Sequence, residues 1–439
     1  MKVLIVGSGG VGESTAAIAK RRDPKGEIFE TIVLADYSLA RAQAASKRLG
    51  DEKRFPAEQV DAGNVDAVVA LCKKYDADML CSFLPVEFNM FTLEAALKAR
   101  VHHMDASTSL SVPDAADPFN KANVVLGETE KALSDEFVKI GKLGLMGFGV
   151  EPGMADWYCR YAADHYFDEI DEIGIRDGAN LEIPGFKGIS FGFSIWMTIE
   201  ECTNPAVVWE RERGFYTVPP LSGLEPFYLP EGIGWVDCAH VEHEEVVHVG
   251  WSEKLLKGVK KATFKYALGD EFIATMEVFK SVNMHSLQPV TVKGVQVRPR
   301  DVVEAAAPDP NEIGKRYVGQ TCGGTWVRGR KDGMERQVYL YQVADNQESV
   351  ALYGTQGVVA QTAFPGVIAL ELLATGRLQG YAGNPEAGVF PAEAFSCDDF
   401  VRMQGEYGFP GGMLEMDAEY KRAMDRAALL EPVSLIPVF

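Results

Sequence analysis

The chain has 439 residues, which is too long for one compact core and suits two domains. Its 47% hydrophobic and 24% charged residues are typical of a soluble globular protein, and its net charge of −20 argues against nucleic acid and anionic membranes as partners. The seven cysteines are scattered, so we expect reduced thiols and no metal site. The chain opens on an apolar strand and has no run of about 18 apolar residues, so we expect a cytoplasmic protein without a membrane span.

The N-terminal residues carry the strongest motif. Apolar residues 3–6 lead into a Gly-x-Gly-x-x-Gly turn, and a run of small residues typical of a helix follows. The first glycine permits a tight turn, the second lets the backbone approach a pyrophosphate, and the third lets the helix pack close to the strand. The free N–H groups at the start of the helix then face the phosphates. The predicted dinucleotide-binding turn consists of Gly7, Ser8, Gly9, Gly10, Val11 and Gly12.

A second apolar run, residues 32–35, ends on an acid, Asp36. A carboxylate at this place accepts hydrogen bonds from the ribose hydroxyls of NAD and repels the 2′-phosphate of NADP. Arg41 is near enough in sequence to bind that phosphate, so NADP remains possible. The alternative role for Asp36 is that of a helix cap. The alternative for the whole unit is a nucleotide-binding or S-adenosylmethionine-binding domain without redox chemistry.

Strands and helices continue to alternate after this unit. We predict helices over residues 64–75, 88–100 and 128–140, and strands over residues 79–83, 101–106 and 144–150. Six strands with intervening helices predict an α/β fold, a doubly wound Rossmann domain spanning residues 1–150.

The pattern then changes to alternating apolar and polar residues, at 170–176, 290–297 and 325–343. Asp332-Gly333 inside the last run predicts a tight hairpin. We therefore expect a second α/β domain over residues 151–350, with a mixed or antiparallel sheet that favours a homodimer. The nearly all-apolar helix 358–374 must be buried, so residues 351–439 are expected to return to the first domain. Residues 204–234, rich in Pro and Gly, are interpreted as a loop over the cleft.

Ligands of an open parallel sheet bind beyond the carboxyl ends of its strands. Three segments follow such ends: 82–89, 105–108 and 147–156. In the third, Glu151 and Asp156 are candidates to hold a substrate ammonium or to move a proton. The alternative is that Glu151 is a turn residue and Asp156 is an acid in the first turn of a helix, where it satisfies the helix dipole. The predicted cofactor contacts at these ends are Phe83, Leu84, Pro85 and Asp105.

A histidine-rich run, residues 240–248, suggests a metal site but lacks the His-Glu-x-x-His spacing. We interpret His243 and His248 as surface or loop residues. Cys81, inside an apolar strand, is expected in the core rather than as a nucleophile.

Further motifs resemble the saccharopine dehydrogenase-like oxidoreductases, which include saccharopine reductase, carboxynorspermidine dehydrogenase and lysine 6-dehydrogenase. They are the glycine turn, 34-Leu-Ala-Asp-Tyr-Ser-Leu-Ala-Arg-Ala-42, 60-Val-Asp-Ala-Gly-63, Leu84-Pro85 and 149-Gly-Val-Glu-Pro-Gly-Met-154. In the second domain, 203-Thr-Asn-Pro-Ala-206, 218-Val-Pro-Pro-Leu-Ser-222, 225-Glu-Pro-Phe-Tyr-228, 297-Val-Arg-Pro-Arg-Asp-Val-302 and 329-Gly-Arg-Lys-Asp-Gly-333 resemble the lysine 6-dehydrogenase branch.

The resemblance implies NAD(P)-dependent hydride transfer at the C–N bond of an amino acid or opine-type secondary amine, including polyamine-type substrates. It implies further cofactor contacts at Tyr37 and Asp61, and substrate contacts at Phe88, Asn89, Phe193 and Ser194. Many relatives carry Tyr or Thr near Val86-Glu87 and Asp or Ala in place of Glu151. A lysine 6-dehydrogenase forming the semialdehyde is one alternative, and a non-catalytic NAD-binding sensor or scaffold is another.

Overall fold

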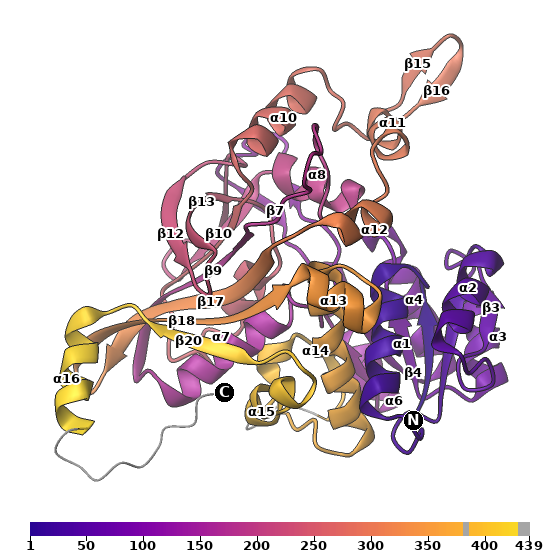
Figure 1. Ribbon diagram of the computed structural model, residues 1–439, viewed down its shortest axis with the longest axis horizontal. Helices are drawn as coiled ribbons and strands as arrows, with labels where there is room; N and C mark the ends of the chain where they lie inside the picture. Colours follow the sequence, from indigo (N-terminus) through magenta and orange to yellow (C-terminus); the bar gives the residue numbers. More distant parts are fainter. Residues whose placement is uncertain (381–385, 429–439) are drawn as a thin grey trace.

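A computed structural model describes residues 1–380 and 386–428 of the chain, which form two large sheets (Figure 1). The first sheet is wholly parallel, with the strand order β19-β8-β5-β4-β1-β2-β3. Its strands are β1 (Lys2–Val6), β2 (Thr31–Asp36), β3 (Ala57–Gln59), β4 (Met79–Ser82), β5 (His102–Asp105), β8 (Leu143–Leu145) and β19 (Gly388–Phe390). The expected doubly wound Rossmann fold is confirmed.

Helices cover both faces of this sheet, because alternate residues of each buried strand point to opposite sides. In β1, Ile5 packs into one apolar cluster and Leu4 into another. The helices of this region are α1 (Gly10–Arg22), α2 (Leu39–Leu49), α3 (Val65–Tyr75), η1 (Val86–Phe88), α4 (Asn89–Ala99), α5 (Glu128–Lys131), α6 (Ser134–Ile140) and α7 (Met154–His165).

Two expected elements differ from those observed. The single helix expected over residues 128–140 is divided into α5 and α6 by a turn at 132–133. The strand expected over residues 144–150 ends at Leu145, because Gly147 has φ +66°, which no strand can continue through. The residues beyond it form the turn that carries Glu151.

The second sheet is mixed, as expected, and follows the order β11-β10-β14-β9-β17-β18-β20, with β13 also paired to β14 and β12 to β13. Within residues 1–380 and 386–428, β9 and β14 are the one parallel pair of this sheet, and the other pairs are antiparallel. Its strands are β9 (Glu169–Ala179), β10 (Ala206–Glu210), β11 (Gly214–Val218), β12 (Glu225–Leu229), β13 (Gly234–His240), β14 (Lys261–Ala267), β17 (Gln320–Lys331), β18 (Met334–Asp345) and β20 (Gly411–Glu415). The tight hairpin at Asp332-Gly333 joins β17 and β18 as predicted.

The interpretation of residues 204–234 as a loop is wrong. This segment forms β10, β11 and β12 and enters β13. Its Pro and Gly residues mark turns between short strands, and Pro226 is tolerated because β12 pairs only with β13 and is an edge strand. Val207 and Val208 of β10 are buried.

The chain returns to the first domain, as expected. Helix α14 (Gly357–Ala374) packs against α1, and Arg22 makes a two-pronged ion pair with the buried Glu371 at 2.9 and 3.0 Å. By length and composition α14 could cross a membrane, but 83% of it is buried, as in a core helix. The return also supplies β19, which sequence patterning did not predict.

The remaining elements connect and flank the two sheets. They are the paired strands β6 (Val112–Pro113) and β7 (Ala122–Val124), the hairpin β15 (Val290–Val292) and β16 (Val295–Val297), and α8 (Ile195–Thr203), α9 (Glu245–Trp251), α10 (Asp270–Ser281), α11 (Pro299–Ala306), α12 (Pro310–Ile313), η2 (Gly314–Arg316), α13 (Asn346–Tyr353), η3 (Ala392–Ala394), α15 (Asp398–Glu406) and α16 (Ala418–Ala428).

Candidate functional site

A cavity of about 1050 Å³ lies where the carboxyl ends of the parallel strands meet the second domain. The first domain contributes residues 9–11, 82–85 and 106–107 to its wall. The second contributes parts of β9, α8, α11 and β17, and the start of α14 closes the wall. The cavity therefore joins the predicted dinucleotide turn to the second domain, as a site for a cofactor and a second reactant requires.

The glycine turn fits a dinucleotide. Gly7 has φ +99°, and a Cβ there would lie 2.3 Å from the carbonyl oxygen of Phe83. A Cβ on Gly12 would lie 2.0 Å from the carbonyl oxygen of Gly7, so both positions require glycine for packing. Gly9 differs, because a Cβ there would meet no atom within 4 Å, and this residue lines the cavity. Among the described residues no side chain caps the start of α1, so its first N–H groups are available to a pyrophosphate.

Asp36 is hydrogen-bonded to the backbone of this turn. Its Oδ2 accepts a hydrogen bond from the Ser8 N–H at 3.0 Å, and its Oδ1 accepts one from the Ser38 N–H at 2.9 Å. Arg41 forms an ion pair with the same carboxylate at 3.4 Å while its own side chain is largely exposed. The acid predicted to accept hydrogen bonds from the ribose and the cation predicted to bind a 2′-phosphate are thus adjacent.

Replacing Asp36 by alanine is expected to raise the KM for NAD by about tenfold more than the KM for NADP, since only NAD loses charge-assisted ribose hydrogen bonds while NADP loses a repulsion. Loosening of the Ser8 backbone acts on both cofactors alike, so the ratio of the two KM values isolates the ribose effect. Initial rates with each cofactor at saturating substrate measure it. Equal changes would refute the ribose role.

The cavity wall is strongly acidic. Among the described residues that line it, none is Lys or Arg, and the acids are Glu151, Asp177, Glu201, Glu244, Asp270, Glu271, Glu304 and Asp309. Because the focused field of so many carboxylates attracts cations, this lining favours a ligand that carries several ammonium groups.

Glu151 and Asp177 form the inner pair of these acids. Glu151 follows β8, and its Oε1 accepts a hydrogen bond from the Gly324 N–H of β17 at 3.0 Å. A side chain at Gly323 would collide with this carboxyl, since its Cβ would lie 2.7 Å from Oε1. Burial raises the pKa of Glu151 to about 7. Burial and the adjacent Glu151 carboxylate raise the pKa of Asp177 well above its ordinary value, so the pair can hold a proton near neutrality.

His243 is the cationic group of the wall. Its ring stacks on Phe264 with centroids 4.0 Å apart, and its Nδ1 lies 2.6 Å from Oε2 of the fully buried Glu245. Burial by itself would lower the pKa of this imidazole, but the carboxylates of Glu245, Glu244 and Glu201 together raise it well above the ordinary value. His243 is therefore an imidazolium facing an acidic cavity. It lies in the loop between β13 and α9, as expected, but it is not a surface residue, since only 11% of its side chain is exposed.

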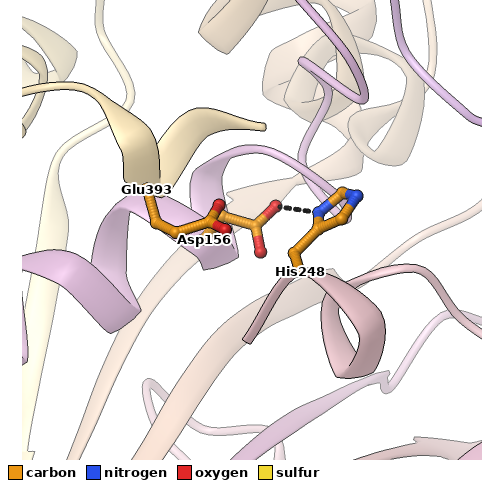
Figure 2. A group of neighbouring side chains, drawn as sticks. All are labelled: Asp156, His248 and Glu393. Atoms are coloured by element: carbon orange, nitrogen blue, oxygen red, sulfur yellow. Dashed lines mark hydrogen bonds and ion pairs between the residues drawn. The ribbon is translucent and has the colours of Figure 1, made fainter. Parts of the chain in front are cut away.

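Asp156 lies behind the wall rather than in it. Figure 2 shows its carboxylate between His248 of α9 and Glu393 of η3, and all three side chains are fully buried. Asp156 Oδ2 accepts the Gly153 N–H and lies 3.0 Å from His248 Nδ1. This cluster ties the Glu151 turn to the second domain. It also corrects the expectation that His248 is a surface or loop residue.

The other predicted site residues are divided between the cavity and its surroundings. Those in the wall are Gly9, Gly10, Val11, Phe83, Leu84, Pro85, Phe193 and Ser194. Asn89 is buried and donates a hydrogen bond to the carbonyl of Ser107 at 2.7 Å. Asp105 is buried and accepts a hydrogen bond from the Gly147 N–H. Both side chains therefore stabilise segments of the cavity wall. Neither Phe88 nor Asp61 lines the cavity, and Tyr37 is 76% exposed beside the turn.

Sequence reasoning missed Asp177, Glu201, His243 and Glu244. An available signal was the charged run 242–245 between apolar residues on both sides, which is unusual for a surface loop. Glu244 accepts the Thr108 N–H at 2.9 Å and so joins this run to the first domain. Cys81, by contrast, is buried in the core as expected.

Comparison with known proteins agrees with this geometry. Residues 3–144 match the family model described as the saccharopine dehydrogenase NADP binding domain, and residues 149–404 match the saccharopine dehydrogenase C-terminal domain. Carboxynorspermidine synthase of Vibrio alginolyticus is 28% identical over 423 residues, covering 95% of this chain and 98% of that protein. Carboxyaminopropylagmatine dehydrogenase of Synechocystis is 28% identical over 412 residues, covering 93% of this chain and 96% of that protein.

A solved structure supports the same fold. Apo saccharopine dehydrogenase (L-Glu forming) from Saccharomyces cerevisiae superposes with a TM-score of 0.65 at 15% identity, covering 95% of this chain and all of that one. The two family models together span most of the chain, and the glycine turn, the strand-end cavity and the mixed second sheet are as the resemblance implies. The chain belongs to the saccharopine dehydrogenase family of NAD(P)-dependent oxidoreductases.

Proposed function

We propose that this enzyme transfers hydride at the C–N bond of a secondary amine that joins a polyamine to a carboxylate-bearing carbon chain. The observation that carries the proposal is the cavity wall with eight acids and, among its described residues, no Lys or Arg. Saccharopine-type substrates are rich in carboxylates, which such a wall would repel, whereas a polyamine carries several ammonium groups. The names of the relatives in Vibrio and Synechocystis point to the same substrate class.

In the synthetic direction, a primary amine and an aldehyde condense to an imine with loss of water, and reduction of the imine gives the secondary amine. The bound nicotinamide dinucleotide supplies the hydride. The chain holds the two reactants together in the cavity, and this orientation is most of what the protein must provide.

Glu151 and Asp177 carry out the proton transfer in this reaction. We assign to Glu151, with its pKa of about 7, the protonation of the nitrogen as the hydride adds to the neighbouring carbon, and Asp177 shares its proton. Asp156 positions the Glu151 turn through the Gly153 N–H and does not reach the cavity itself. The acids further along the wall, among them Asp270 and Glu271, bind the distal ammonium groups.

The His243 imidazolium provides the counter-ion for the substrate carboxylate, since the other charged groups that the structure describes in the wall are acids. Replacing His243 by glutamine is expected to raise the KM for a polyamine–carboxylate adduct by about tenfold or more, the equivalent of losing one charge-assisted hydrogen bond. The KM of a matched amine without the carboxylate should change little. An equal increase for both amines would argue against a carboxylate partner.

A screen at 340 nm tests the proposal. Wild-type enzyme with NAD or NADP is mixed with lysine, saccharopine or a polyamine–carboxylate adduct such as carboxynorspermidine, and the appearance of reduced cofactor is followed. We expect turnover with the polyamine adducts. Turnover with lysine alone would identify a lysine 6-dehydrogenase instead. Silence with every substrate, despite tight cofactor binding, would favour the sensor alternative.

A further inference from the structure

Two fully buried acids lie close together behind the cavity wall. Asp156 is in the first turn of α7 and Glu393 is in η3, and Figure 2 shows both beside His248 of α9, which is equally buried. No Lys or Arg within residues 1–380 and 386–428 forms an ion pair with either acid. Buried charges in proteins are paired or coordinate metal ions, so this pair needs a source of positive charge.

The hydrogen bonds of the cluster leave one polar atom free on each side chain. Asp156 Oδ2 accepts the Gly153 N–H and lies 3.0 Å from His248 Nδ1, and Glu393 Oε1 accepts a hydrogen bond from the Ser252 hydroxyl at 2.6 Å. The buried atoms without a hydrogen-bond partner in the described structure are Asp156 Oδ1, Glu393 Oε2 and His248 Nε2.

Protonation of the acids does not satisfy these atoms. Asp156 and Glu393 share no hydrogen bond within the described residues, so they do not hold a common proton. A proton placed on Asp156 Oδ1 or on Glu393 Oε2 would create a buried O–H donor with no acceptor, which is itself costly. The cluster therefore lacks a cation rather than a proton.

The spacing and the chemistry of the cluster suit a metal ion. One ligand atom from each of the three side chains lies within 4.8 Å of the other two. Zinc binds imidazole nitrogen and carboxylate oxygen at about 2.0–2.2 Å, so two of its ligands lie up to about 4.4 Å apart. One imidazole with two carboxylates favours a transition metal over Mg²⁺ or Ca²⁺, which prefer oxygen ligands alone. A divalent ion also neutralises the two carboxylates.

We propose that Asp156, His248 and Glu393 together bind one divalent transition-metal ion, with Zn²⁺ as its best representative. None of the three residues lines the cavity, so the ion has a structural role and does not touch the substrate. It joins α7, α9 and η3, three segments far apart in the sequence. Because Asp156 also accepts the Gly153 N–H, the ion holds the turn that carries Glu151. The proposal does not depend on which amine the enzyme uses.

Metal analysis of the full, untagged chain by mass spectrometry tests the proposal. The ligands are fully buried, so the ion enters as the chain folds, and the expression medium must contain zinc. We expect about one zinc ion per wild-type chain. Asp156→Asn and Glu393→Gln should each lose it. The matched control is His165→Gln, which breaks an exposed His–Asp398 pair of 2.7 Å and should keep the ion.

A wild-type chain without a transition metal would overturn the proposal, and so would Asp156→Asn and Glu393→Gln proteins that keep their zinc. Refolding of the wild type keeps the test decisive if these variants do not fold. Chain refolded with Zn²⁺ should have a higher thermal midpoint than chain refolded with EDTA, and chain refolded with Co²⁺ should show the visible absorption of a bound cobalt ion. Equal midpoints together with a colourless cobalt sample would contradict a metal site.

Discussion

Replacing Glu151 by glutamine is expected to lower kcat for imine reduction by about 10² to 10⁴-fold, the usual contribution of a general acid. Glutamine keeps the size of the side chain and can still accept the Gly324 N–H, so the turn should keep its shape. Only the proton is lost. Single-turnover measurements of the 340 nm decay separate this step from product release, and Glu52→Gln, an exposed acid remote from the cavity, serves as the control.

The pH dependence of imine reduction is expected to have a definite direction. Only the protonated carboxyl donates, so its contribution to reduction is complete at pH values below about 7 and is lost as the pH rises through that value. The ratio of the wild-type rate to the Glu151→Gln rate should therefore fall with rising pH, and titration of the substrate amine cancels in this ratio. A ratio that stays constant from about pH 5 to about pH 9, roughly two units either side of the expected pKa, would remove Glu151 from the proton transfer.

Replacing Gly9 by alanine is expected to abolish measurable cofactor binding, with a loss of about 10²-fold or more, while leaving the thermal unfolding midpoint unchanged. A Cβ at this position meets no protein atom within 4 Å, so the fold does not resist it, yet the methyl group occupies the space that a pyrophosphate needs. Fluorescence titration with NADH and NADPH measures the affinity.

Gly12→Ala is the matched comparison in the same turn. Its Cβ would lie 2.0 Å from the carbonyl oxygen of Gly7, so the backbone itself must move and the protein should lose thermal stability. If Gly9→Ala kept full affinity, the pyrophosphate could not lie against this turn. If Gly9→Ala unfolded the protein, the distinction between the two glycines would be wrong.

The first domain could be predicted from sequence because its signals are local. Apolar strands such as residues 32–35, the glycine turn and the acid after the second strand each lie within a few residues of one another. The edge strand β19 could not, since three residues carry little pattern and their partner β8 lies more than 240 positions away. The strands at 206–229 were missed because their frequent turns look like a loop.

For the same reason, only part of the candidate site could be predicted from the sequence. Glu151 follows a strand end and was found by that rule. Asp177 and His243 enter the cavity from the second domain, and nothing within their own segments places them opposite the glycine turn. The unusual charge state of His243 depends on Glu201, 42 residues earlier in the chain, as well as on its neighbours Glu244 and Glu245. Such convergence is a property of the tertiary structure.

The central claim is that the cavity directs hydride to the carbon of a C–N bond in a polyamine-type amine. It is tested most directly by mass spectrometry of the product formed from an amine, an aldehyde carrying a carboxylate and a cofactor deuterated at nicotinamide C4. We predict one deuterium on the carbon next to the new secondary nitrogen. Deuterium found only in the alcohol derived from the aldehyde, or in no product that contains the polyamine, would contradict the claim.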